Sequence, residues 1–161
     1  MTKEKEGDIF AIPLGDDTYG FGQVSRDFDH AYFDLRSLTI PDLTEIVRYP
    51  VIFRVPVGKH TIRAGGWRIL GNLPLAQALA DYQAYRNQPV GSNQLYIYRA
   101  GQFTPAGVDD VRHLEAFAFW FPAHIVERLQ DHFAGRPNRT FEFFKRIKKY
   151  DLQTGQEIGF W

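Results

Sequence analysis

Residues 7–24, GDIFAIPLGDDTYGFGQV, contain two apolar segments joined by a short polar stretch. The first segment is apolar and partly β-branched, and the second begins at Tyr19, so both are typical of strands. Asp16 and Asp17 between them can bond local backbone N–H groups and tolerate left-handed geometry, which suits a turn. The stretch therefore predicts a β-hairpin that serves as scaffold.

The same stretch contains the pair Gly20 and Gly22, which fall on one face of the second strand. Two glycines on one face permit another backbone to approach closely or the sheet to bend. A Gly-x-Gly pair also occurs in phosphate-binding loops, but a dinucleotide fingerprint needs a third glycine where Ser25 stands. Residues 26–31, RDFDHA, lack an apolar helical face, so no helix N-terminus is expected there to hold an anion. The strand interpretation is therefore favoured over the phosphate loop.

The rest of the chain alternates between strand and helix patterns. We expect strands at 31–35, 50–57, 66–72, on both sides of Ala100–Gly101, and at 113–121. Helices are expected as a short turn near Pro41, over 73–86 and over 122–135, and residues 140–150 fit either a helix or a strand. The pattern predicts an α+β fold that is mainly antiparallel β-sheet with two or three helices.

Composition limits the classes of protein and of chemistry. The chain has 161 residues, of which 44% are hydrophobic, which suits one domain over residues 1–161 with a sizeable core. The absence of cysteine excludes disulfides, thiol catalysis and cysteine metal ligands. The 19 basic and 19 acidic residues balance, which argues against nonspecific phosphate binding by a basic protein and against an acidic nucleic-acid mimic.

Targeting signals are not evident in the sequence. The first ten residues, MTKEKEGDIF, are charged and lack the apolar core of a signal peptide. No uncharged apolar run approaches the roughly 20 residues that span a bilayer. We therefore expect a cytoplasmic protein without a membrane partner.

Two groups of polar residues are candidates for chemical sites. His124, Glu127 and Asp131 share the polar face of the helix expected at 122–135, where they could hold a divalent metal. Metal sites normally need three or four converging ligands, and an amphipathic helix must have a polar face in any case. We therefore predict no metal site on this helix.

His30 lies among Asp27, Asp29 and Asp34 and could act as a general base. However, no serine lies in a Gly-x-Ser-x-Gly nucleophile elbow, so a polar loop between strands is the favoured interpretation. We predict no catalytic residues and no cofactor.

Charge is clustered at two places along the chain. Asp27, Asp29 and Asp34 lie in RDFDHAYFD, and four bases lie in KRIKKY, namely Lys145, Arg146, Lys148 and Lys149. The segment FEFFKRIKKY interleaves cations with aromatics, as single-strand nucleic-acid platforms do. Its aromatics can equally be core anchors, with the bases as a solvated edge, and the neutral net charge favours this second interpretation.

Five segments follow one another in the first half of the chain: GDIFAIPLGDDTYGFGQV, YFDLRS, IPDL, PVIFRVPV and GGWRILGNLPL. Together they resemble the immunity protein 26 family of bacterial polymorphic toxin systems, while the second half matches only loosely. The resemblance implies a β-rich scaffold without catalytic residues or cofactor. It also implies that the protein binds and neutralises a cognate toxin in the producing cell and its siblings, as in contact-dependent inhibition.

The charge clusters then suggest where a toxin would bind. A nuclease toxin has a basic substrate groove, so the acidic cluster with its neighbouring aromatic is the first candidate. The predicted toxin-binding residues are Asp16, Asp17, Asp27, Asp29, Tyr32 and Asp34. The alternative interface is Lys145, Arg146, Lys148 and Lys149, and the alternative function is nucleic-acid binding by that C-terminal segment.

Overall fold

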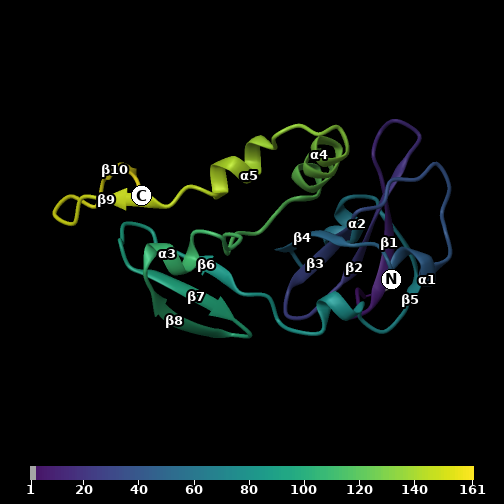
Figure 1. Ribbon diagram of the computed structural model, residues 1–161, viewed down its shortest axis with the longest axis horizontal. Coiled ribbons are helices and arrows are strands. Elements are labelled where there is room, and N and C mark those ends of the chain that lie inside the picture. The colour runs from purple at the N-terminus through teal and green to yellow at the C-terminus, as the bar shows by residue number, and fades with distance from the viewer. Residues whose placement is uncertain (1–2) are drawn as a thin grey trace. The chain divides into compact units, whose positions relative to one another are not determined.

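The computed structural model describes residues 3–161, and the contacts within the chain group them into two compact units. Unit 1 comprises the chain up to Asp81 together with Phe119–Asn138, and unit 2 comprises Tyr82–Ala118 and Arg139–Trp161. Antiparallel strands dominate, so the predicted α+β class is confirmed (Figure 1). The prediction that residues 1–161 act as one domain stays a prediction.

Unit 1 is built on a five-stranded antiparallel sheet in the order β4-β3-β2-β1-β5. The strands are β1 (Asp8–Pro13), β2 (Tyr19–Val24), β3 (Asp29–Phe33), β4 (Val51–Pro56) and β5 (Arg68–Asn72). The register of β1 and β2 pairs Phe10 with Gly22 and Ile12 with Gly20. The predicted hairpin is therefore confirmed, and it lies at the middle of the sheet.

The turn between β1 and β2 uses the residues that the sequence assigned to it. Asp17 has a φ of 64° and Gly15 a φ of 84°, both in the left-handed region. The carboxylate of Asp16 accepts a hydrogen bond from the backbone N–H of Thr18 at 3.2 Å. Such a bond within the turn is typical of aspartate at this position.

Unit 1 also contains the longest helix. Its helical elements are α1 (Leu43–Ile46), α2 (Thr61–Ala64), the 3₁₀ turn η1 (Gln77–Leu79) and α4 (Pro122–Phe133). The predictions of a short turn near Pro41 and of a helix from Pro122 are confirmed. Proline is tolerated at the start of α4 because the first helical residues need no N–H donor.

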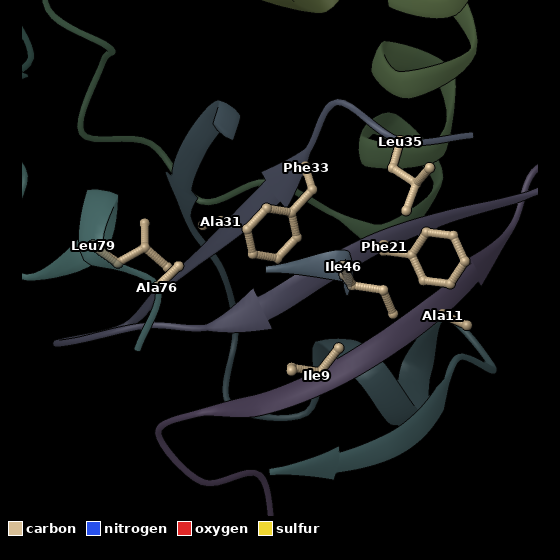
Figure 2. Close-up of a cluster of buried hydrophobic side chains, with 9 residues drawn as sticks. All are labelled: Ile9, Ala11, Phe21, Ala31, Phe33, Leu35, Ile46, Ala76 and Leu79. Carbon is tan, nitrogen blue, oxygen red and sulfur yellow. The ribbon is translucent and has the colours of Figure 1, made fainter. Parts of the chain in front are cut away.

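One face of the sheet carries the aliphatic core of unit 1. Alternate residues of the central strands point to this face, where they meet residues of α1 and η1 (Figure 2). The buried cluster consists of Ile9, Ala11, Phe21, Ala31, Phe33, Leu35, Ile46, Ala76 and Leu79.

The opposite face is aromatic and centres on Phe10. Its ring stacks on Trp67 at 5.6 Å with an interplanar angle of 6°, and it lies 5.1 Å from His30 and 6.1 Å from Tyr32. A Cβ atom on Gly22 would lie 2.5 Å from this ring. Glycine at this position therefore makes room for the Phe10 side chain, whereas the sequence predicted the approach of another backbone or a bend in the sheet.

Helix α4 covers part of the same aromatic face. The side chain of Leu129 is fully buried and lies against Gly20, where an added Cβ would be 3.3 Å away. The guanidinium of Arg128 lies 3.9 Å from the centre of the Phe53 ring and 4.9 Å from that of Trp120. These cation–π contacts and the apolar stripe hold the helix against the sheet.

The helix expected over 73–86 does not form. Only η1 is helical, and Tyr85–Asn87 is strand β6. The amide of the buried Gln23 accepts a hydrogen bond from the N–H of Ala76 at 3.1 Å and donates to the carbonyls of Leu73 and Pro74. These carbonyls therefore bond to Gln23, and this tertiary contact overrides the helical spacing of Leu75 and Leu79.

The strand expected over 113–121 is also absent. Residues up to Ala118 belong to unit 2 and residues from Phe119 to unit 1. The ring of Phe117 packs at 4.2 Å against Tyr98, whereas that of Phe119 lies 5.8 Å from Phe28. The alternating phenylalanines thus fill two different environments and do not line one face of a strand.

Unit 2 contains a three-stranded sheet in the order β6-β7-β8 and a separate two-stranded sheet. The strands are β6, β7 (Leu95–Arg99), β8 (Gln102–Ala106), β9 (Lys148–Tyr150) and β10 (Glu157–Phe160), and the helices are α3 (Val108–Val111) and α5 (Arg139–Phe144). The two strands around Ala100–Gly101 are confirmed, and the turn residues have φ values of 49° and 82°.

The ambiguous segment 140–150 is both helix and strand. It begins in α5 and ends in β9, with Ile147 between them as a buried residue of the unit 2 core. Of the expected core anchors Phe141, Phe143, Phe144 and Ile147, only Ile147 is buried, since Phe143 is 56% exposed and α5 buries no residue. Over residues 3–161, no helix has both the length and the hydropathy needed to cross a bilayer.

The contact between Gly22 and Phe10 predicts the effect of adding one methyl group. In Gly22→Ala the Cβ would lie 2.5 Å from the Phe10 ring and 2.8 Å from the carbonyl oxygen of Ala31. We expect overpacking to lower the free energy of unfolding by about 1–3 kcal/mol, measured by urea denaturation. Gly58→Ala is the matched control, because the nearest atom to its Cβ is 3.7 Å away. Equal stability of the two variants would contradict this account.

Candidate functional site

Three of the predicted toxin-binding residues lie at one end of the unit 1 sheet. Asp16 and Asp17 occupy the hairpin turn, and Asp34 directly follows β3, which ends beside the start of β2. Arg36 donates to the carboxylate of Asp16 at 2.6 Å, and His132 lies 2.9 Å from that of Asp34. We call these five residues the hairpin-tip surface.

The electrostatics of the hairpin tip keep Asp16 ionised. The side-chain hydrogen bond from Thr18 is the main cause that lowers the pKa of Asp16, and the Thr18 backbone N–H and the charge of Arg36 add to it. Asp17 is exposed and projects from a left-handed backbone position. The surface therefore presents fixed negative charge together with one arginine.

A shallow cavity adjoins the hairpin tip. It has a volume of about 370 Å³ and is lined by the tip and by the last turn of α4. Gln130 of α4 donates a hydrogen bond to the backbone carbonyl of Leu14 at 2.6 Å and so connects the helix to the hairpin. The surface is thus supported by secondary structure on two sides.

The other predicted toxin-binding residues lie elsewhere. Asp27 is exposed in the turn that joins β2 to β3, at the opposite end of these strands from the hairpin tip. Asp29 is 3% exposed and Tyr32 is fully buried. The expectation that the acidic cluster forms one polar loop is therefore wrong, because β3 runs between β2 and β4 with both of its faces covered.

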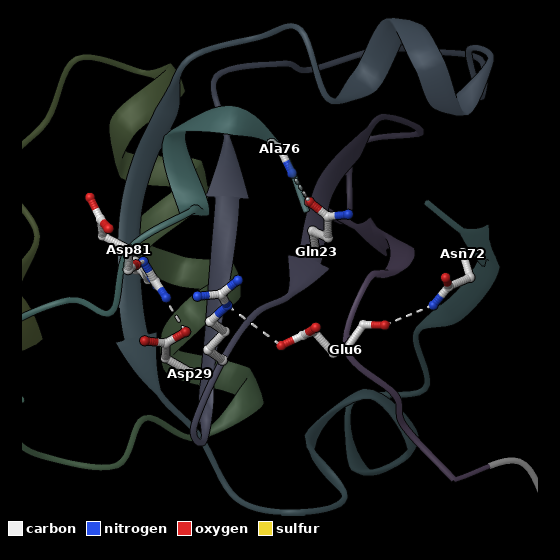
Figure 3. A network of polar contacts seen from close by, with 8 residues as sticks. Glu6, Gln23, Asp29, Asn72, Ala76 and Asp81 are labelled. Atoms are coloured by element: carbon white, nitrogen blue, oxygen red, sulfur yellow. Dashed lines mark hydrogen bonds and ion pairs between the residues drawn. The ribbon is translucent and has the colours of Figure 1, made fainter. Parts of the chain in front are cut away.

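Asp29 is part of a buried network of hydrogen bonds (Figure 3). Its carboxylate lies 2.9 Å from Nε of Arg54, which is itself 5% exposed. Another guanidinium nitrogen of Arg54 donates to the backbone carbonyl of Asp81 at 2.7 Å. The ion pair therefore holds the far end of the 73–81 segment, as Gln23 holds its start.

His30 is also buried, on the aromatic face of the sheet. Its Nε2 lies 3.4 Å from the carboxylate of Glu4, and its exposed fraction is 2%. Burial also raises the pKa of the neighbouring Tyr32 well above its usual value, so this phenol stays neutral. These groups lie in the packed interior, and the expectation of a polar loop around His30 is wrong.

The helix candidates for metal ligation do not converge. His124 and Glu127 are exposed, and the carboxylate of Asp131 accepts hydrogen bonds from Arg136 and Asn138 at 3.2 and 3.0 Å. No group of three or more His, Asp or Glu side chains that could hold a metal ion occurs in residues 3–161.

The predicted alternative interface lies in unit 2, and its four bases each lie over an aromatic ring. Lys149 lies 4.5 Å from the ring centre of Trp161 and Arg146 lies 5.2 Å from that of Phe160. Both rings are about half exposed, at 47% and 49%. We call the bases Lys145, Arg146, Lys148 and Lys149 with these rings the C-terminal basic surface.

The sequence interpretation missed a second basic region, which lies in unit 1. A cavity of about 700 Å³ is lined by Lys3, His60, Arg63, Trp67 and Arg68, among others. We call these five residues the cationic groove. Four of them come from KHTIRAGGWR, residues 59–68, whose density of bases around a tryptophan was the available signal.

The buried ion pair predicts a large loss of stability when one partner is removed. Asp29→Ala leaves the Arg54 cation buried without its carboxylate, so we expect a loss of about 3–5 kcal/mol in the free energy of unfolding, measured by urea denaturation. Glu6→Ala removes the exposed contact with Arg26 at 3.7 Å and should leave the midpoint nearly unchanged.

The isosteric Asp29→Asn keeps an acceptor oxygen. Its urea midpoint should therefore lie between those of Asp29→Ala and Glu6→Ala. A midpoint for Asp29→Ala as high as that for Glu6→Ala would refute the buried-pair account.

Comparison with known proteins supplies the family. No curated protein and no solved structure matched this chain in the searches. The model of the family described as Immunity protein 26 matches residues 5–94, which are more than half of the chain and include all five strands of the unit 1 sheet. The chain therefore belongs to the immunity protein 26 family.

Proposed function

We propose that this protein binds and neutralises a cognate toxin of a bacterial polymorphic toxin system, in the cytoplasm of the producing cell and without catalysis of its own. The observation that carries the proposal is the family match over residues 5–94. The family's name describes immunity, and immunity to a protein toxin requires a protein partner.

The use of the buried polar groups supports a binding role. Gln23 and Arg54 hold backbone segments of unit 1 in place, and Asp29 pairs with Arg54. The hydrogen bonds of these groups are directed to the fold, whereas the paired side chains at the hairpin tip contact one another and remain 38–48% exposed. A rigid sheet that presents charge on a short turn suits rapid and specific association with another protein.

Within this function, we propose the hairpin-tip surface as the toxin-binding site. Its carboxylates suit a toxin whose substrate groove is basic, since complementary charge speeds diffusional encounter. The cavity beside it, between the tip and α4, offers a recess for a side chain of the toxin. The C-terminal basic surface is the alternative interface and would suit an acidic toxin.

A second candidate function is nucleic-acid binding by the C-terminal basic surface. The observation that favours it is the placement of four bases over aromatic rings in one short segment. Exposed rings next to cations can stack on nucleobases while the cations contact phosphates. Glu142 and Glu157 lie 3.9 and 3.2 Å from two of the lysines, which reduces the positive charge available to phosphates.

Charge removal at the hairpin tip tests the proposed toxin site. In Asp17→Asn with Asp34→Asn, asparagine still tolerates the left-handed backbone at position 17 while two charges are lost. We expect association with the toxin domain encoded beside this gene to slow by about tenfold, with weaker protection of cells that express the toxin. Surface plasmon resonance and survival on co-expression measure the two effects.

The matched control is Lys148→Gln with Lys149→Gln, which also removes two charges. We expect this variant to bind and protect like the native protein. If Lys148→Gln with Lys149→Gln weakens binding and protection while Asp17→Asn with Asp34→Asn does not, the interface is the C-terminal basic surface. Failure of the native protein to protect against the neighbouring toxin would overturn the proposed function itself.

The nucleic-acid function predicts salt-dependent binding of a fluorescent oligothymidine by the purified protein. Fluorescence anisotropy should then rise with protein concentration, weaken with added salt, and weaken by several-fold in Lys148→Gln with Lys149→Gln. Identical titrations for the native and substituted proteins would contradict a role for this surface in nucleic-acid binding.

A further inference from the structure

The cationic groove is a concave site in the part of the chain that the family model matches. It lies among residues 3–4, helix α2 and strand β5, and its volume of about 700 Å³ is within the usual range of ligand sites. The hairpin-tip surface and the C-terminal basic surface share no residue with it. The groove is therefore a separate candidate for recognition.

The charges that line the groove are mostly positive. Lys3, Arg63 and Arg68 are exposed cations at its wall, and His60 is an exposed imidazole beside them. Glu4 is the one carboxylate among the lining residues, and one of its oxygens accepts the backbone N–H of Ile62 at 2.9 Å. Its other oxygen faces the buried His30 at 3.4 Å. Because Glu4 is directed into the protein, the groove presents a net positive charge to a ligand.

Beyond the groove the charge is mixed. A neighbouring cavity of about 280 Å³ shares Lys3, Glu4 and His60 with the groove and adds Lys59, but it also adds the carboxylates of Asp27 and Asp29. The cations of the groove itself come from the N-terminal segment, from α2 and from β5, so a ligand that matches them must itself be extended. A single small anion would contact only part of this set.

The floor of the groove excludes nucleotides that would bind by stacking their base on Trp67. One face of the Trp67 indole stacks on Phe10, and the backbone at Gly65 lies so close to the indole that an added Cβ would be 2.6 Å from it. The indole is 7% exposed, so it has little free surface for a nucleobase to stack on. Ile62 and Ile69 complete an apolar floor, which suits the aliphatic parts of amino-acid side chains.

Strand β5 adds backbone hydrogen-bonding groups to the wall. It is an edge strand, and across the described chain only β1 pairs with it. The N–H and C=O groups on its outer side therefore have no strand partner, which makes this edge suitable for an added extended segment. Main-chain bonds to β5 would orient the ligand while its side chains reach Arg63 and Arg68.

From these observations we propose that the cationic groove binds an extended acidic peptide segment of the cognate toxin. This inference rests on the proposed function, because the toxin is the source of the segment. Carboxylates match the guanidinium groups of Arg63 and Arg68 in shape as well as in charge. The toxin would then carry an acidic segment, in addition to whatever surface meets the hairpin tip.

The first test uses a peptide and no toxin. A fluorescein-labelled oligoglutamate peptide is titrated with the purified full-length protein, and binding is followed by fluorescence anisotropy. We expect saturable, salt-sensitive binding that weakens by about tenfold in Arg63→Gln with Arg68→Gln. An oligoglutamine peptide should not bind, because it lacks the charge.

The control is Arg48→Gln with Arg139→Gln, which removes two exposed cations outside the groove and outside the C-terminal basic surface and should retain the affinity for oligoglutamate. Circular dichroism and the melting temperature verify that each variant is folded. Equal weakening in the two variants would show nonspecific attraction and overturn the proposal, as would the absence of saturable binding to the native protein.

The second test separates the groove from the proposed function. The native protein and Arg63→Gln with Arg68→Gln are each expressed in cells together with the neighbouring toxin domain, and survival is measured. We expect the native protein to protect and the groove variant to protect less. If the variant loses peptide binding but protects fully, the groove does not serve toxin recognition, although the immunity function stands. If neither protein protects, the proposed function fails first.

Discussion

The fit of the Phe10 ring over Gly22 is the contact on which unit 1 depends. The absence of a side chain at position 22 leaves room for the ring, which contacts Trp67, His30 and Tyr32. Protein interiors are close-packed, so a side chain at position 22 would displace this whole aromatic layer. The indole that Phe10 supports is also the floor of the cationic groove, which ties the proposed ligand site to the central packing.

The opposite face of the sheet is closed by polar contacts at its border. Gln23 and Arg54 each reach from a strand to the backbone of the 73–81 segment, and Asp29 neutralises the arginine. Buried amides and charges are costly unless they are hydrogen-bonded, and here Gln23 and Arg54 bond to backbone groups that have no helix or sheet to satisfy them. The polar network thus replaces regular secondary structure where the chain crosses the aliphatic core.

The zero net charge of the chain hides an uneven distribution over its surfaces. Carboxylates gather at the hairpin tip, cations line the groove between α2 and β5, and further cations lie over aromatic rings in unit 2. A protein inhibitor benefits from such separate patches of opposite sign, because wrong partners then meet like charge at one of them. The proposed function and the proposed groove ligand are both consistent with this arrangement.

The sequence by itself determined the elements whose signals are local. The turn aspartates and the apolar segments on both sides predicted the first hairpin, and the stripe after Pro122 predicted α4, because spacing and turn chemistry act within a few residues. The resemblance of the first half to the immunity protein 26 family was likewise visible in its ordered motifs. Leu75 and Leu79 have helical spacing, yet their segment is held open by Gln23 from more than fifty residues earlier in the chain.

Only the tertiary structure decided which charges are available to a partner. Asp27, Asp29 and Asp34 lie close together in sequence, but β3 carries Asp29 into the interior and places the other two at opposite ends of the sheet. Arg54 lies in an otherwise apolar strand, and nothing local identified Asp29 as its partner. The cationic groove likewise combines Lys3 with residues 60–68, which the chain brings together only when β5 pairs with β1. Burial and long-range pairing depend on the whole fold, and this is why local patterns could name the charged residues but not their surfaces.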